Sequence, residues 1–104
     1  MRDVLRDVDA WTAKGDRVAL ATVVAVRRSA PRPAGAKMAI SSSGEVSGAV
    51  SGGCVEGSVV MAAEEVLAGA DPRLMSFGIA DEEAWSVGLP CGGEIDVWVE
   101  RYEP

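Results

Sequence analysis

The chain has 104 residues, of which 48% are hydrophobic, so it is long enough for one domain whose core needs no disulfide or metal. With 16 acidic and 10 basic residues its net charge is −6, which disfavours nonspecific binding to nucleic acid or anionic membranes. It contains no histidine, which excludes histidine-dependent nucleophiles, metal ligands and proton shuttles. No stretch approaches the ~20 apolar residues of a membrane span, and the N-terminus is unlike a signal peptide. We therefore expect a soluble, cytoplasmic protein.

A short amphipathic helix is predicted near the N-terminus, ending at Lys14-Gly15. Its apolar positions at helical spacing are Val4, Leu5, Val8 and Trp11. The next segment, 18–26, is an apolar run typical of a buried strand, which we expect at the centre of the sheet. Its bulky face consists of Val18, Leu20, Thr22, Val24 and Val26. Its small face consists of Ala19, Ala21 and Ala25, which suits the close packing of a helix.

The segment 27–35 is predicted to be a loop, because Pro31 and Pro33 remove backbone donors and disfavour helix before them. Strand character at 36–40 and 45–50, on either side of a turn at 41–44, predicts a hairpin. Helical spacing predicts a helix over 54–68 with Gly69 as its C-terminal cap. Its apolar positions are Val55, Val59, Ala62, Ala63 and Val66.

Two further strands are predicted at 74–77 and 95–99, on either side of a loop at 78–93. The last strand alternates clearly, with Asp96 and Trp98 on its polar face. Together these elements predict a single α/β (α+β) domain with a mixed sheet of about five strands and two main helices.

The only two cysteines lie in glycine-rich frames, Ser51-Gly52-Gly53-Cys54-Val55-Glu56 and Gly88-Leu89-Pro90-Cys91-Gly92-Gly93-Glu94. Glycines let a ligand approach closely and leave a neighbouring sulfur accessible. Cys54 would begin the helix over 54–68, where the helix dipole lowers the pKa of a thiol and where an oxyanion can also bind. Cys91 would emerge at the same end of the sheet if the last strand lies beside the strand that leads into this helix.

Other readings of the cysteines stay open. Two thiols fall short of the four ligands of a structural zinc site, and a cytosolic chain disfavours a disulfide. Cys54 could instead pack as a small apolar residue, with its glycines making a tight turn, and Cys91 could be a turn cysteine without a partner.

The segment 28–37 forms a basic loop in this acidic chain, because no acid occurs between Asp16 and Glu45. Guanidinium groups in this loop could hold a phosphate or carboxylate through paired hydrogen bonds. Prolines on both sides of Arg32 fix its direction at low entropic cost, whereas a solvated surface is the better interpretation for Arg27 and Arg28. Elsewhere, Trp98 indicates either a partner surface or packing under the first helix.

Four segments of the chain resemble the XdhC/CoxI family in order and spacing. They are Ser29-Ala30-Pro31-Arg32, Gly35-Ala36-Lys37-Met38, Gly48 to Glu56 and Gly88 to Gly93. The resemblance covers about Val18 to Glu100, and its long central motif is specific. It implies an accessory protein of molybdenum enzymes such as xanthine dehydrogenase and aerobic carbon monoxide dehydrogenase, more a cofactor chaperone than an enzyme.

The resemblance also implies what the protein binds and where. It implies transient binding of the molybdenum cofactor (molybdopterin), with Cys54 and Cys91 as contacts to molybdenum and Arg32 near the anionic part. The other implied site residues are Ser51, Gly52, Gly53, Glu56, Gly92 and Gly93. The implied partners are an apo molybdenum hydroxylase, a cysteine desulfurase and a separate Rossmann-domain chain, and homo-oligomerisation stays open.

The chain departs from the family pattern in two ways. Arg28 stands where members commonly have glycine, which leaves the role of Arg28 open. Many members continue into a C-terminal Rossmann-type domain, and we expect 1–104 to be a single XdhC/CoxI-like domain without it.

Two alternative functions stay open. One is a sulfur relay that carries a persulfide on Cys54 and resolves it with Cys91. The other is a structural subunit that docks on a dehydrogenase through Trp85 or Trp98.

Overall fold

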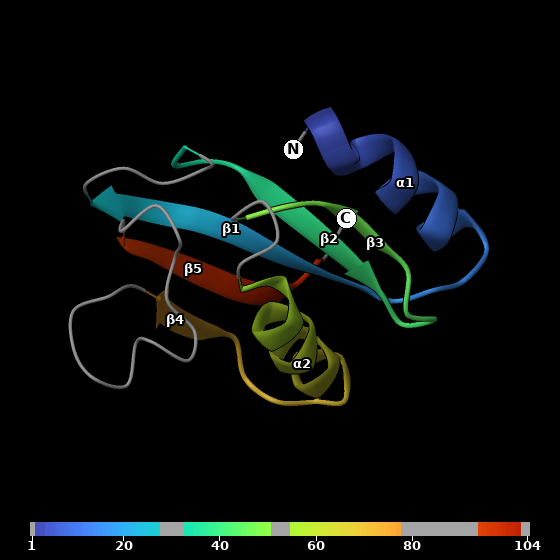
Figure 1. Ribbon diagram of the computed structural model, residues 1–104. Coiled ribbons are helices and arrows are strands. Elements are labelled where there is room, and N and C mark those ends of the chain that lie inside the picture. The colour runs from blue at the N-terminus through green and yellow to red at the C-terminus, as the bar shows by residue number, and fades with distance from the viewer. Residues whose placement is uncertain (1, 28–32, 51–54, 78–93, 103–104) are drawn as a thin grey trace.

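The computed structural model describes residues 2–27, 33–50, 55–77 and 94–102, which form one sheet with two helices (Figure 1). The helices are α1 (Arg2–Ala13) and α2 (Glu56–Leu67). The strands are β1 (Val18–Arg27), β2 (Lys37–Ser41), β3 (Val46–Gly48), β4 (Arg73–Phe77) and β5 (Glu94–Arg101). This arrangement confirms the predicted fold class and the predicted order of elements.

The strand order is β3-β2-β1-β5-β4, so β1 is central, as predicted. All four neighbouring pairs among the described strands are antiparallel, where a mixed sheet was predicted. The helix α2 does connect two parallel strands, β3 and β4, but these lie at opposite edges of the sheet. Because three strands separate them, no parallel pair of neighbours forms among the described strands.

Helix α2 packs on one face of the sheet, over β1 and β5. All five of its predicted apolar positions are buried, and they share one core with the small residues Ala19 and Ala21 of β1. The small side chains let the helix approach closely, as the sequence pattern predicted. The same core includes Ile95, Val97 and Val99 from β5.

A β-bulge in β1 changes which residues face α2. Val23 pairs with Val97, but Ala25 pairs with Asp96, so the register shifts between them. One inserted residue exchanges the two faces of a strand beyond the bulge. Val26 consequently packs against the α2 core, whereas the sequence pattern had assigned Ala25 to that face.

Helix α1 covers part of the opposite face of the sheet. Val4, Val8 and Trp11 are buried in a second core, whereas Leu5, predicted for the same face, is 38% exposed. The sheet contributes Val18, Leu20 and Ala39 to this core. Thus β1 stands between two separate cores.

Helix α2 begins at Glu56, two residues after its predicted start, and its N-cap residue is Val55. At its other end Gly69 has a φ of +117°, which few residues other than glycine adopt. The amide of Gly69 donates to the carbonyl of Val66, and that of Ala70 donates to the carbonyl of Glu65. These two bonds form the Schellman motif that closes a helix at glycine, so Gly69 has its predicted role.

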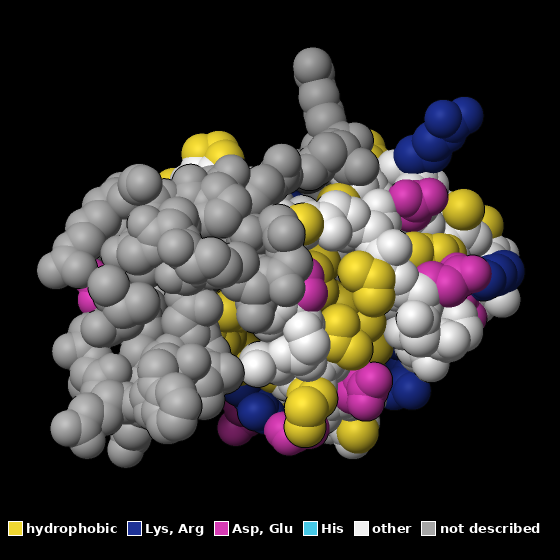
Figure 2. All heavy atoms as spheres, viewed as in Figure 1, with side chains coloured by type: hydrophobic (Ala, Val, Ile, Leu, Met, Phe, Trp, Pro, Cys, Tyr) yellow, Lys and Arg dark blue, Asp and Glu magenta, His cyan; other side chains and the backbone are white. Residues whose placement is uncertain are grey.

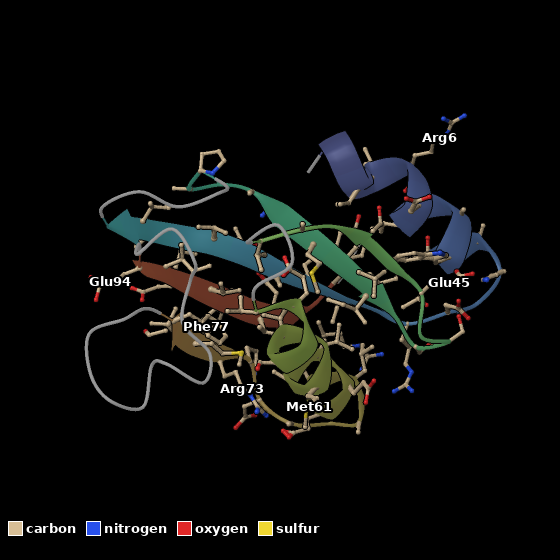
Figure 3. All side chains as sticks on the ribbon, viewed as in Figure 1. Arg6, Glu45, Met61, Arg73, Phe77 and Glu94 are labelled. Atoms are coloured by element: carbon tan, nitrogen blue, oxygen red, sulfur yellow. The ribbon has the colours of Figure 1, made fainter. Side chains whose placement is uncertain are left out.

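The surface seen in Figure 2 mixes hydrophobic side chains with acidic and basic ones over its described part. Met61, on the outer side of α2, is 69% exposed, and Figure 3 shows it pointing away from the sheet. Single exposed apolar side chains of this kind are normal on folded domains.

Candidate functional site

The segments predicted to form the site attach to one end of the sheet. Arg27, the last residue of β1, pairs with Glu94, the first residue of β5. The segments that contain Arg32 and Cys91 therefore leave the sheet from neighbouring strands. Strand β3 runs in the same direction as β1, since both are antiparallel to β2. Figure 3 shows Glu94 at this end and Glu45 at the opposite end.

Of the predicted site residues, the structure describes Glu56 alone. Those that lie outside the described residues are Cys54, Cys91, Gly52, Gly53, Gly92, Gly93, Arg32 and Ser51. Their grouping around a cofactor stays a prediction. The strand adjacency on which the placement of Cys91 beside Cys54 depended does not occur, because β5 pairs with β1 and β4 and not with β3.

Glu56 forms a hydrogen bond with the residue that directly precedes the segment 51–54. The backbone amide of Val50 donates a hydrogen bond of 3.0 Å to Glu56 Oε2. Val50 is fully buried and Val55 is 2% exposed, and both belong to the core beneath α2. The two residues that flank the segment 51–54 are therefore fixed to the body of the domain.

Gly48 directs the chain from β3 into this segment. Its φ is +78°, and a Cβ at this position would lie 2.4 Å from the carbonyl oxygen of Lys37 and 2.6 Å from Val4 Cγ1. Both the conformation and the close approach require glycine. The sequence indicates Gly48 only as part of the family motif, because the neighbours that exclude a side chain come from β2 and α1.

The N-cap residue of α2 has an apolar side chain. This residue, Val55, makes no side-chain cap hydrogen bond, since valine offers no acceptor. The next residues include Gly57, where a Cβ would meet nothing within 4 Å. The first-turn amides of a helix favour a bound anion. Cys54 immediately precedes Val55 in the sequence.

The described end of the basic loop is a tight turn. The amide of Ala36 donates to the carbonyl of Pro33 at 3.1 Å, and the amide of Gly35 donates to the carbonyl of Val23 at 2.7 Å. Gly35 has a φ of +94°, as the third residue of a turn of this kind requires. Lys37 donates to Thr22 Oγ1 at 2.8 Å, so this cation of the basic segment is held on the sheet.

A cleft of about 420 Å³ lies at the opposite end of the sheet. It is lined by Arg17, Ser41, Ser42, Ser43, Gly44, Glu64, Leu67 and Ala68. The guanidinium group of Arg17 donates to the carbonyl oxygen of Leu67, and the amide of Arg17 donates to Ser42 Oγ at 2.9 Å. The sequence did not indicate that Arg17 joins the end of α2 to the β2–β3 turn, because these bonds depend on where α2 ends against that turn.

Trp98 lies on the sheet face opposite α2. It pairs with Thr22 of β1 and with Leu74 of β4, and Leu74 is 56% exposed. Trp98 is partly buried but belongs to neither of the two described cores. The expectation that it packs under α1 is therefore not met, whereas Trp85 lies outside the described residues.

Neither a clustered metal site nor a membrane-spanning helix occurs in the part of the chain that the structure describes. There, no group of three or more histidine, cysteine, aspartate or glutamate side chains could hold a metal ion. None of the described helices is long and apolar enough to cross a membrane. The predicted contacts to a metal, Cys54 and Cys91, lie outside the described residues.

Comparison with known proteins gives consistent matches. The model of the XdhC and CoxI family matches residues 11–78, more than half of the chain. The chain is 34% identical over 101 residues to the "Molybdenum cofactor insertion chaperone PaoD" of Escherichia coli, covering 96% of this chain and 31% of that protein. It is also 34% identical over 96 residues to a protein of Bacillus subtilis named as a probable xanthine dehydrogenase subunit, covering 90% of this chain and 29% of that one.

The fold also matches a solved structure. The crystal structure of a xanthine dehydrogenase from Bacillus halodurans superposes with a TM-score of 0.78 and 27% sequence identity, over 95% of this chain and 30% of that one. The chain therefore spans between 29 and 31% of the length of these three proteins.

Proposed function

Because the chain belongs to the XdhC and CoxI family, we propose that it binds the molybdenum cofactor and inserts it into a molybdenum hydroxylase. The observation that carries this proposal is the 34% identity, over 96% of the chain, to a protein named as a molybdenum cofactor insertion chaperone. Two similar proteins carry xanthine dehydrogenase in their names, which supports an enzyme of that type as the recipient.

In the proposed mechanism the cofactor is cargo held from two sides. The thiolates of Cys54 and Cys91 hold or shield the molybdenum end, because thiolates are soft ligands. Arg32 and the first-turn amides of α2 hold the phosphate. The glycines beside the cysteines let the bulky cargo approach the backbone. Transfer then requires the recipient enzyme to displace the thiolates from the molybdenum end and the protein groups from the phosphate.

Three observations on the described residues support this arrangement. Arg27 and Glu94 pair at one end of the sheet, so the segment of Arg32 begins beside the point where the segment of Cys91 ends. The N-cap residue of α2 supplies no competing side-chain acceptor. The bond between Val50 and Glu56 closes the segment that carries Cys54.

The proposal can be tested by cofactor retention and transfer. The chain is purified anaerobically from cells that make the cofactor, molybdenum and pterin are measured per chain, and the loaded protein is mixed with an apo molybdenum hydroxylase. We expect near-stoichiometric pterin and recovery of hydroxylase activity. Cys54→Ser and Cys91→Ser should each lower retention by about tenfold or more, the scale on which loss of a supporting group lowers metal affinity.

Met61→Ala is a suitable control, because it removes an exposed sulfur-bearing side chain from α2 and should leave retention unchanged. Retention of stoichiometric pterin by the Cys54→Ser, Cys91→Ser double variant would contradict the role of the thiols. A chain that never retains pterin but gains the mass of one sulfur on Cys54 after desulfurase treatment would instead indicate a sulfur relay.

A further inference from the structure

We propose that Glu56 is a positioning residue: its carboxylate bonds across the segment between Val50 and Val55 and thereby sets the place of Cys54, and this carboxylate does not contact the cofactor. This inference rests on the proposed function. It reassigns the only predicted site residue that the structure describes.

The hydrogen bond from Val50 to Glu56 satisfies a buried donor. Val50 is fully buried, and its amide donates to Glu56 Oε2 at 3.0 Å. A buried amide without a partner is costly, and a bond to a carboxylate is stronger than one to a neutral acceptor. The carboxylate therefore fixes the backbone just before the segment 51–54.

Glu56 is also well placed to make this bond. It is the first residue of α2, where a negative charge is stabilised by the helix dipole. The N-cap residue Val55 has no side-chain acceptor. The acidic side chain of the first turn instead reaches back to an amide six residues earlier, so one bond spans the whole segment 51–54.

The charge of Glu56 argues against direct contact with the cargo. The proposed cargo carries a phosphate at the first turn of α2, and a carboxylate that pointed at this phosphate would repel it. One carboxylate oxygen of Glu56 is already an acceptor for Val50. We therefore assign the cargo contacts to Cys54, Cys91, Arg32 and the first-turn amides of α2, and assign to the Glu56 carboxylate the bond that holds Cys54 in place.

The test compares Glu56→Ala, which removes the acceptor, with Glu56→Gln, which keeps an acceptor but removes the charge. Glu64→Ala, an exposed position on the same helix, is the control. Amide hydrogen exchange at Val50 is measured by NMR on the full chain without cofactor, and amides of β1 report any global loss of stability. Pterin retention is then measured for each variant.

For Glu56→Ala we expect Val50 to exchange at least about tenfold faster and pterin retention to fall by about tenfold, since a bond to a charged group is lost. The amides of β1 should change much less. Glu56→Gln should restore both quantities to within about threefold of the unchanged protein, and Glu64→Ala should alter neither.

Two results would overturn the inference. Unchanged protection of Val50 in Glu56→Ala would mean that the carboxylate does not close the segment. Normal protection of Val50 in Glu56→Gln, together with retention as poor as in Glu56→Ala, would mean that the charge itself acts on the cargo. If the unchanged protein retained no pterin, the proposed function would fail, while the exchange at Val50 would still decide whether the closure exists.

Discussion

Gly48 illustrates how one residue can control the path of the chain toward the candidate site. Its φ of +78° and the closeness of the Lys37 carbonyl leave no room for a side chain. Shortly beyond it, Val50 bonds to Glu56. The residues of the motif that lie in the described part thus hold the chain in place on both sides of the segment 51–54.

We predict that Gly48→Ala destabilises the fold by about 2 to 4 kcal/mol, because alanine adds both backbone strain and overlap with β2. The free energy of unfolding is measured by urea titration. Gly57→Ala is the matched control, since a Cβ there meets nothing within 4 Å. It should leave stability unchanged or raise it by up to about 1 kcal/mol. Equal losses in the two variants would contradict this explanation.

At the scale of elements, α2 is fixed at its two ends by different means. Its N-terminus is tied to the preceding segment through Glu56, and its C-terminus ends in the glycine motif at Gly69. The guanidinium group of Arg17 adds a bond to the carbonyl of Leu67. A cation is favourable at this end of a helix, because it meets the negative end of the helix dipole.

We predict that Arg17→Met lowers the free energy of unfolding by about 1 kcal/mol, because a charge-assisted bond to the helix C-terminus is lost. Thermal or urea unfolding followed by circular dichroism measures this. Arg6→Met is the control, because Arg6 is exposed and points away from α1 in Figure 3. Its effect should stay within about 0.5 kcal/mol. The idea fails if Arg17→Met behaves like Arg6→Met.

The elements differ in how well the sequence predicted them. Local periodicity predicted α2 and its glycine cap because both signals lie within a few residues of each other. The bulge in β1 was not predicted, since Val18 to Val26 reads as regular alternation. The irregularity appears only in the pairing of Val23 and Ala25 with β5, and a cross-strand register leaves no local signal.

For the whole molecule, the main feature is that two cores share one sheet. The α1 core contains Val8, and the α2 core contains Val59. Strand β1 contributes Val18 and Leu20 to the first core, and Ala19 and Ala21 to the second. Because successive residues of one central strand belong to different cores, we expect the two cores to unfold together.

We predict that Val8→Ala and Val59→Ala each cost about 2 kcal/mol, because each deletes fully buried methyl groups. The double variant should show the sum within about 0.5 kcal/mol, since the sites lie on opposite faces of the sheet and share no core. Urea unfolding is followed by tryptophan fluorescence and by far-ultraviolet circular dichroism, which should give one coincident transition. Separate transitions for the two probes would contradict a single cooperative unit.

For the candidate site too, the sequence predicted some features and the structure added others. The residue types of the motif, with thiols among glycines and an arginine between prolines, predicted accessible thiols and an anionic ligand, and the family resemblance implied which cofactor that ligand is. They did not reveal that Glu56 bonds to Val50, or that Arg27 pairs with Glu94. Both contacts depend on how the chain folds back on itself, which residue types alone do not specify.

By itself, the sequence determined the number and order of elements, the central place of β1 and the family of the chain, because periodicity, turn residues and motifs are local. Only the tertiary structure decided the antiparallel pairing of the described strands, the bulge, the requirement for glycine at position 48 and the role of Glu56. These features depend on contacts between segments that pack together only in the folded chain. The packing of both helices on the sheet brings these segments into contact, and no short stretch of residues encodes that packing.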